Sequence, residues 1–226
     1  MKKKVSKYLL EFLVIVMGIS ISFYVEKRNA NMYKQTLKNQ SLHRISNNIK
    51  VDIADMEYNY TAHTIASDAI AWIVNNNSDL LNRPKDSIGK NISNAILVNT
   101  IFVDNQEEYR ALQSSGLIEL IEIEKVVSAL QNKYSAHEFY KQIEKAITDS
   151  SRPLEEFLYS NTVLVDERTN RLGFQSGRIF TGDKKIPQPI IERLKGKKWL
   201  HDFYIDRVKT LMKRDSTLIK LIEDEI

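Results

Sequence analysis

The sequence contains no cysteine, and only seven of its 226 residues are glycine and four are proline. Without cysteine the chain has no disulfide scaffold, no thiolate zinc site, no CxxC redox site and no cysteine nucleophile. The glycine and proline content is less than half the share of roughly 12% in an ordinary globular protein. This scarcity disfavours a turn-rich β-sandwich or barrel. It favours a mainly α fold with long helices.

Acidic side chains are slightly fewer than basic ones, which gives a formal net charge of +4. Most of the excess lies at the start of the chain, where Lys2, Lys3, Lys4 and Lys7 stand against Glu11. That segment accounts for +3 of the total, so the remaining residues carry a net charge of only +1. A surface that binds nucleic acid needs a concentrated basic patch. We therefore expect no nucleic-acid partner.

Residues 8–25, YLLEFLVIVMGISISFYV, form the longest apolar run, in which Glu11 is the only strongly ionisable side chain. As a helix they would be about 27 Å long, close to the ~30 Å hydrocarbon layer of a bilayer. Aromatic residues lie at both ends of the run, as is typical of membrane interfaces. The sequence predicts a transmembrane anchor at residues 8–25, hereafter the anchor segment, and a lipid bilayer as partner. A head, residues 1–7, precedes it, and an extramembrane domain, residues 26–226, follows.

Two other interpretations of the run remain. A cleaved signal peptide would use Ser20-Ile21-Ser22 as its cleavage site, although Glu11 is unfavourable in so short an apolar region. A buried helix of a soluble protein is the second alternative. It would place four lysines in an unusual position beside a helix that is apolar all round.

The orientation of the anchor depends on the basic residues that flank it. Lysines precede the run, but Lys27, Arg28, Lys34 and Lys38 follow it closely, so the count is nearly balanced. A short basic head before a large domain favours a cytoplasmic N-terminus. We expect a single-pass protein of a bacterial inner membrane with its C-terminal domain in the periplasm.

Glu11, Gly18 and Ser22 share one face of the anchor helix. Their spacings of seven and four residues place them within roughly 40° of one another. Small residues allow a second helix to approach, and a carboxyl group can find a partner across such an interface. The face therefore predicts a homo-oligomer or a membrane protein partner. In the alternative, Glu11 simply pairs with Lys7 one turn away.

Apolar residues recur every seven positions after the anchor, which predicts one helix over residues 27–75 that leaves the membrane as a rod. A parallel coiled coil is disfavoured because Asp52 and Asn59 make the second seam polar. We expect this helix to pack on its own domain, and the asparagine-rich run 75–79 to end it. The repeating positions are Leu42, Ile49, Met56, His63 and Ile70.

The rest of the domain is expected to be a helical bundle with one long loop or weak hairpin. Asn105 and Glu108 have the spacing of a capping box that opens a short helix ending at Ser114-Ser115-Gly116, with Gly116 as the residue after the helix. An irregular insert is expected at about 161–187, with the hairpin around 168–173. The other predicted helices are 86–103, 121–150, 154–159 after Pro153, 190–195 and, beyond Gly196, 199–225.

No motif in the sequence indicates catalysis, a cofactor or a metal. Gly177 and Gly182 have the spacing of a phosphate-binding P-loop, but Asp183 stands where its lysine should be. His137-Glu138 begins like HExxH, yet Lys141 replaces the second histidine. The histidines fall on separate segments, and His201-Asp202 is no ready-made dyad because neighbours on a helix point about 100° apart. The lysines at 184, 185, 195, 197 and 198 are expected to form a solvated basic face, with an anionic-ligand site as the alternative.

Two stretches resemble an uncharacterised family of short, N-terminally anchored helical membrane proteins of the Bacteroidota. The first is Lys7-Tyr8-Leu9-Leu10-Glu11, followed by Val16-Met17-Gly18-Ile19. The second is Tyr109-x-x-Leu112-x-Ser114-Ser115-Gly116, followed by Leu120-Ile121 and Tyr134. The chain departs from the family pattern at Leu117, where asparagine is usual. The resemblance implies an anchored, helical topology and no particular activity.

These features predict a membrane-anchored helical protein that acts by binding, as a structural or assembly component of the bacterial envelope, without catalysis. One alternative is a ligand-binding sensor that signals laterally through the face formed by Glu11, Gly18 and Ser22. The other is an enzyme that uses the 161–187 loop. The sequence identifies no small-molecule substrate.

Overall fold

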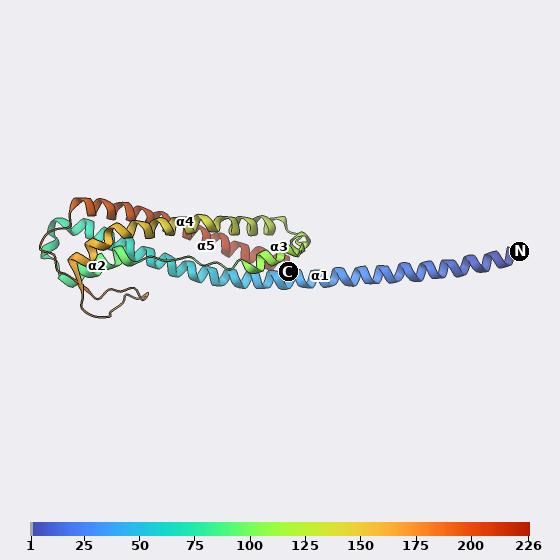
Figure 1. Cartoon of the computed structure of the whole chain (residues 1–226). Helices are drawn as coiled ribbons and strands as arrows, with labels where there is room; N and C mark the ends of the chain where they lie inside the picture. Colours follow the sequence, from blue (N-terminus) through green and yellow to red (C-terminus); the bar gives the residue numbers. More distant parts are fainter. Residues whose placement is uncertain (1) are drawn as a thin grey trace.

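The computed structural model describes residues 2–226, with side chains from residue 8 onward except that of His137. The expected head, residues 1–7, therefore lies outside the described side chains. The chain forms an elongated helical bundle from which one helix projects as a long shaft (Figure 1). The expected mainly α fold is confirmed.

Helix α1 (Lys2–Asn76) is continuous from the shaft to the far end of the bundle (Figure 1). Residues 8–34 are exposed, and the first buried side chain is that of Lys38. From Leu42 onward the heptad face is buried against the rest of the chain, as expected for a helix that packs on its own domain. The 3₁₀-helix η1 (Asn77–Asn82) follows the end of α1 within the asparagine-rich run.

Three further columns pack around α1. Helix α4 (Glu124–Asn161) runs away from the shaft, and helix α5 (Gln188–Glu225) returns toward it (Figure 1). The last column is interrupted: it consists of α2 (Lys85–Leu97), an extended stretch, α3 (Glu107–Ser114) and the 3₁₀-helix η2 (Leu117–Leu120). Glu225 of α5 ties the columns together near the shaft. Its carboxylate binds Lys38 Nζ at 2.6 Å and accepts the Ile123 N–H before α4 at 2.8 Å.

The apolar core of the described residues consists of three large clusters along the bundle and a small fourth one around Ala62, Ala66 and Val98. The cluster near the shaft joins α1, α3, η2, α4 and α5. The central cluster surrounds Met56, Phe102 and Tyr204. The distal cluster is the largest and covers the end of α1, α2, the end of α4 and the start of α5. Polar side chains are buried along the same axis, including Asp52, His63, Glu144, Lys197 and Asp215.

The helix predicted over 86–103 is too long, because α2 ends at Leu97. The next residues are extended, and carboxylates of neighbouring helices accept their backbone N–H groups in place of helical carbonyls. Glu144 accepts the Phe102 N–H at 2.8 Å, and Asp52 accepts the Asn105 N–H at 3.2 Å. A single-sequence pattern does not reveal these tertiary acceptors.

The predicted capping box at Asn105 is also wrong. The N-cap residue of α3 is Gln106, and it makes no side-chain capping bond. The Asn105 amide instead donates to Asp52 at 2.8 Å. Glu108 binds Arg44 at 2.8 Å, so both members of the expected box serve contacts with α1.

Two predicted helix breaks are absent. Helix α4 continues through Pro153, where we expected a stop near Ser150 and a new helix at Leu154. Helix α5 likewise continues through Gly196. In both helices the buried face keeps its spacing across the breaking residue, so packing outweighs the local cost of Pro or Gly. The buried residues that span the sites are Ile147, Leu154 and Leu158 in α4, and Ile191, Leu194, Lys197 and His201 in α5.

The irregular insert is a hairpin at the end of the bundle far from the shaft (Figure 1). Strands β1 (Thr162–Leu164) and β2 (Arg178–Phe180) pair antiparallel, with Val163 opposite Ile179. An isolated bridge joins Thr169 to Gln175 near the tip, within the region where a hairpin was expected. Gly173 closes the tip with φ of 84°, which favours glycine.

Candidate functional site

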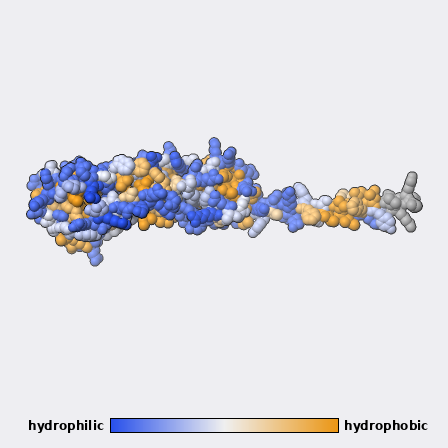
Figure 2. All heavy atoms as spheres, turned by 45° about the horizontal axis from the view of Figure 1, so that its top comes forward, coloured by the Kyte–Doolittle hydropathy of each residue, from blue (hydrophilic) through white to orange (hydrophobic). Residues whose placement is uncertain are grey.

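The anchor segment is the part of the structure whose surface is most clearly unlike that of a soluble protein. Helix α1 contains an 18-residue window with a mean hydropathy of 2.0, of which 0% is buried. Figure 2 shows this apolar stretch on the projecting shaft, followed by a hydrophilic stretch before the bundle. The helix is long and apolar enough to cross a membrane. The side chains of this window are exposed, whereas those of a core helix in a soluble protein would be mostly buried.

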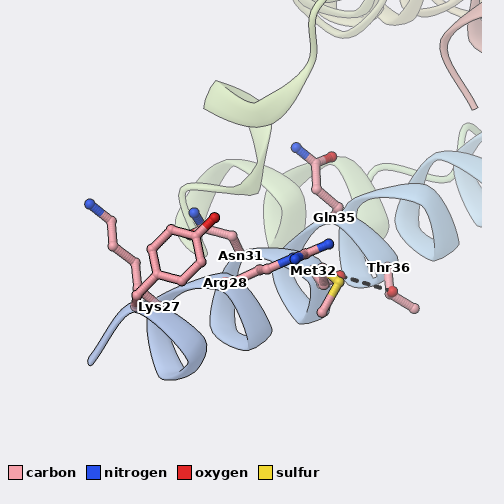
Figure 3. A pocket seen from close by; sticks show the side chains of 7 residues that line it. Lys27, Arg28, Asn31, Met32, Gln35 and Thr36 are labelled. Carbon is pink, nitrogen blue, oxygen red and sulfur yellow. Dashed lines mark hydrogen bonds between the residues drawn. The ribbon is translucent and has the colours of Figure 1, made fainter. Parts of the chain in front are cut away.

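A polar collar follows the anchor segment where α1 approaches the bundle. Lys27, Arg28, Asn31 and Gln35 line an open concave surface along the helix (Figure 3). The Thr36 hydroxyl donates to the Met32 carbonyl at 3.0 Å within the helix. Lysine and arginine at this position match the headgroup region next to a membrane span.

The predicted association face is exposed on the shaft. The Ser22 hydroxyl donates to the Gly18 carbonyl at 2.9 Å, which satisfies the hydroxyl without a partner helix. An added Cβ at Gly18 would meet nothing within 4 Å, so a neighbouring helix has room to approach there. Glu11 lies on the same side of α1. The alternative pair of Glu11 with Lys7 lies outside the described side chains.

The helix-stop motif has a structural role at the shaft end of the bundle. Tyr109 stacks on Tyr134 with ring centroids 4.3 Å apart, and Leu112 is fully buried. The Ser114 and Ser115 hydroxyls donate to helical carbonyls at 3.2 Å. Gly116 has φ of 71°, as expected for the residue that ends a helix.

A buried ionic cluster joins α1, α4 and α5. Lys133 Nζ lies 2.9 Å from Asp52 and 2.7 Å from Asp215. Burial by itself lowers the pKa of Lys133, but the two carboxylates outweigh it and raise the pKa. Lys133 therefore stays charged, and the Asp52 carboxylate also accepts a hydrogen bond from the Asn105 side-chain amide at 2.8 Å.

His63 of α1 and His201 of α5 meet in the centre of the bundle. Their Nδ1 atoms lie 2.8 Å apart, and His63 Nε2 lies 2.8 Å from Thr100 Oγ1. Burial, aided by the positive charge of Lys197, lowers the pKa of His63 to about 3. The pKa of His201 is also well below its usual value, chiefly because of burial. Both rings are therefore neutral at physiological pH.

Glu144 is the final acceptor of this chain of hydrogen bonds. Its carboxylate accepts the Phe102 N–H and the Tyr204 hydroxyl, both at 2.8 Å, and also bonds Thr100. The tautomers that satisfy this acceptor have His201 donating to His63, His63 to Thr100, and Thr100 to Glu144. His201 Nε2 is then a buried lone pair without a partner among the described residues. Burial raises the pKa of Glu144.

The expectation that Lys197 belongs to a solvated basic face is wrong. Its side chain is only 1% exposed and donates to Ser151 at 2.6 Å and to the Ile96 carbonyl at 2.9 Å. Burial lowers its pKa to about 7. Although a neutral lysine beside a serine can act as a base, both side chains are buried, which gives a substrate no access. The other lysines of the expected face, Lys184, Lys185, Lys195 and Lys198, are exposed or half-buried.

The sequence placed His63 on the inner face of its helix. It predicted neither the contact of His63 with His201 nor the burial of Lys197. The missed signal was the continuing three- and four-residue spacing of Leu194, Lys197, His201 and Tyr204. The expected break at Gly196 concealed it. Asp202 binds Ser67 and Lys198 and does not serve His201, as expected.

The remaining motifs take no part in a site of the expected kind. Gly177 to Gly182 belongs to the hairpin around β2, and no helix begins after it as a P-loop requires. The side chain of His137 lies outside the described residues. Within the described part of the chain, no group of three or more His, Asp or Glu side chains has an arrangement that could hold a metal ion.

Comparison with known proteins identifies no relative: the chain matches no known family, no curated protein and no solved structure.

Proposed function

We propose that this chain is a single-pass membrane protein of the bacterial envelope that acts by binding, as a structural or assembly component. The observation that carries the proposal is the anchor segment, an apolar helix with no protein packed around it that continues without a break into the bundle. The resemblance to the anchored Bacteroidota family supports the same topology. In this proposal the N-terminus is cytoplasmic and the bundle is periplasmic.

Orientation is tested with two C-terminal fusions. Alkaline phosphatase is active only after export, whereas green fluorescent protein exported in unfolded form does not fluoresce. We expect phosphatase activity and no fluorescence. The reverse pattern would contradict the periplasmic location and leave the anchor itself in place.

Exposed aromatic side chains on the outer face of α4 and α5 support a role in protein binding. Trp199 is 63% exposed and stacks on Phe203 at 5.5 Å, while Phe139 meets Phe203 edge-on at 6.2 Å. Arg207 lies over the Phe203 ring at 5.0 Å. Tryptophan and arginine are enriched among the residues that dominate protein–protein binding energies. We call Phe139, Trp199, Phe203 and Arg207 the aromatic face.

A photo-crosslinking amino acid at Trp199 tests this face in living cells. We expect a discrete crosslinked product with a protein of the envelope, identified by mass spectrometry. The matched control is Val51, which is 61% exposed on α1. Equal products at both positions, or none at Trp199, would contradict binding through the aromatic face. A product of twice the chain mass would identify a homo-oligomer as the partner.

The second candidate is a sensor that signals sideways through its anchor helix. The uninterrupted course of α1 favours it, because a displacement within the bundle reaches the anchor segment through one rigid element. Gly18→Leu and Glu11→Gln should then change the pattern of crosslinked oligomers in the membrane. Val16→Leu, on the opposite side of the helix, should not. An unchanged pattern in all three variants would contradict lateral association.

A further inference from the structure

A polar pocket lies between the start of α2 and the hairpin. Its volume is about 400 Å³, within the range of small-molecule sites. Unlike most such sites it is lined by charged and hydroxyl side chains: Asp86, Ser87, Lys90, Arg168, Thr169, Ser176 and Arg178. Three of these side chains are cations and one is an acid.

Two glycines allow the walls of the pocket to meet. A Cβ on Gly89 of α2 would clash with the backbone carbonyl of Arg178, so β2 lies directly against the helix there. A Cβ on Gly177 would clash with Asp166, which the adjacent turn of the hairpin carries. The pocket is thus built by close backbone packing, which fixes Arg178 beside Lys90.

The Arg178 guanidinium is held firmly in place. The residue Arg178 is only 7% exposed. Its Nε donates to Thr162 Oγ1 at 2.8 Å and its Nη1 donates to Gln175 Oε1 at 3.1 Å. The guanidinium also lies over the Tyr159 ring, 5.2 Å from its centroid. These partners are all uncharged. Among the described residues, no carboxylate forms an ion pair with Arg178 or with Lys90. A buried cation without a counter-ion is costly, and a bound anion would supply one.

The remaining charges set the polarity of the pocket. Arg168 is neutralised by Asp166, whose Oδ2 lies 2.7 Å from Nε. Asp86 is exposed and accepts the Ser87 N–H at 2.7 Å. Asp166 offsets the charge of Arg168. Lys90 and Arg178 together outweigh the single charge of Asp86, so the pocket has a net positive charge. Ser87, Thr169 and Ser176 provide hydroxyl groups around these two cations.

We propose that this pocket binds a small soluble oxyanion, a molecule bearing a carboxylate or phosphate group, between Lys90 and Arg178. The size and hydrophilic lining suit a small, charged ligand. The hairpin lies at the end of the bundle far from the shaft (Figure 1). The helix from residue 25 to 76 is about 77 Å long, so headgroups of the anchoring membrane are out of reach. The exclusion of membrane headgroups as the ligand rests on the proposed anchor, whereas the binding of an oxyanion in the pocket does not.

Calorimetric titration of the full-length protein in detergent tests the proposal. The probes are inorganic phosphate and citrate in a buffer of low ionic strength. We expect saturable binding of at least one probe, weakened about tenfold or more by Lys90→Gln and by Arg178→Gln, since each removes a charge-assisted hydrogen bond. Lys90 is exposed and makes no ion pair, so its variant folds even where the Arg178 variant does not. Asp86→Asn should strengthen binding by removing a repulsive charge.

Matched controls are Lys85→Gln and Arg171→Gln, which remove exposed cations near the pocket that do not line it. Both should bind the probe like the unaltered protein. The proposal is overturned if neither probe binds saturably, or if control and pocket variants weaken binding equally. It is also overturned if the protein binds vesicles of anionic lipid through this face but neither free probe. None of these results bears on whether the protein is anchored.

Discussion

The Nδ1 atoms of His63 and His201 face each other at 2.8 Å across the interface of α1 and α5. One ring must donate and the other accept, so adding a proton to the accepting nitrogen would place two N–H groups against each other. The hydrogen bond therefore requires the accepting Nδ1 to stay unprotonated. The pair joins α1 to α5, so we expect the interface between these two helices to be sensitive to acid.

We predict that acid destabilises the protein through this pair. The folded protein holds the pKa of His63 at about 3, whereas the unfolded chain binds a proton near the ordinary value of 6.5. The unfolded state therefore carries more protons between these values, and the free energy of unfolding falls as the pH drops below about 6.5, by up to about 1.4 kcal/mol per pH unit for each such group. Denaturant unfolding between pH 7.5 and 4.5 measures the slope.

The histidine variants separate this effect from that of the carboxylates. His63→Gln should reduce the loss of stability on acidification. His43→Gln, at an exposed position of the same helix, should leave it unchanged. Identical pH profiles for the unaltered protein and His63→Gln would show that the pair does not control acid stability.

Lys197 gives a prediction on the alkaline side. Its pKa in the folded protein is about 7, against 10.5 for an exposed lysine, so the unfolded chain binds the extra proton between these values. The free energy of unfolding should rise from pH 7 toward pH 10, by up to about 1.4 kcal/mol per unit. Lys197→Met should flatten this rise, whereas Lys195→Met at an exposed site should keep it. A rise that persists in Lys197→Met would refute the assignment.

The ionic cluster around Lys133 predicts a large and specific loss of stability. Lys133→Met would leave Asp52 and Asp215 buried without their cation, which costs about 3–5 kcal/mol in comparable buried pairs. Lys145→Met removes an exposed ion pair with Asp149 and should cost less than about 1 kcal/mol. Both values come from chemical denaturation at pH 7.5. Similar losses for the two variants would mean that the cluster contributes no more than a surface pair.

Two glycines with opposite surroundings give a matched comparison. Gly89→Ala forces a Cβ against the Arg178 carbonyl and should destabilise by about 1–3 kcal/mol. Gly196→Ala meets nothing within 4 Å inside α5 and should stabilise by about 1 kcal/mol, because alanine favours the helix. Thermal unfolding of both variants tests the pair. A destabilising Gly196→Ala would argue against an unbroken α5.

The sequence predicted the elements whose signal is local. The heptad face of α1 gave a helix that packs on its own domain, and Gly116 was correctly placed at the end of a helix. The errors arose where distant groups decide the backbone. The residues after Leu97 are extended because carboxylates of α1 and α4 accept their N–H groups, and α4 passes Pro153 because its buried face continues.

The candidate sites also differ in whether their signal is local in the sequence or depends on contacts between distant residues. The apolar helix at residues 8–25 was evident from hydropathy alone, because a helix that could cross a bilayer requires a continuous apolar run. The oxyanion pocket was not, because Lys90 and Arg178 are distant in sequence and meet only through the contact of Gly89 with β2. The glycine spacing from Gly177 to Gly182 was not interpreted as a phosphate-binding loop, because Asp183 stands where the lysine should be, and in the structure this segment surrounds β2.

The central claim is that the anchor segment lies in lipid. Fractionation of cells that make the full-length chain, with alkaline carbonate extraction followed by detergent, tests it most directly when combined with mass spectrometry of the intact protein. We expect an unprocessed chain that stays in the carbonate-resistant membrane fraction and enters solution only with detergent. Recovery of the intact chain in the aqueous fraction, or of a chain cleaved near Ser22, would contradict it.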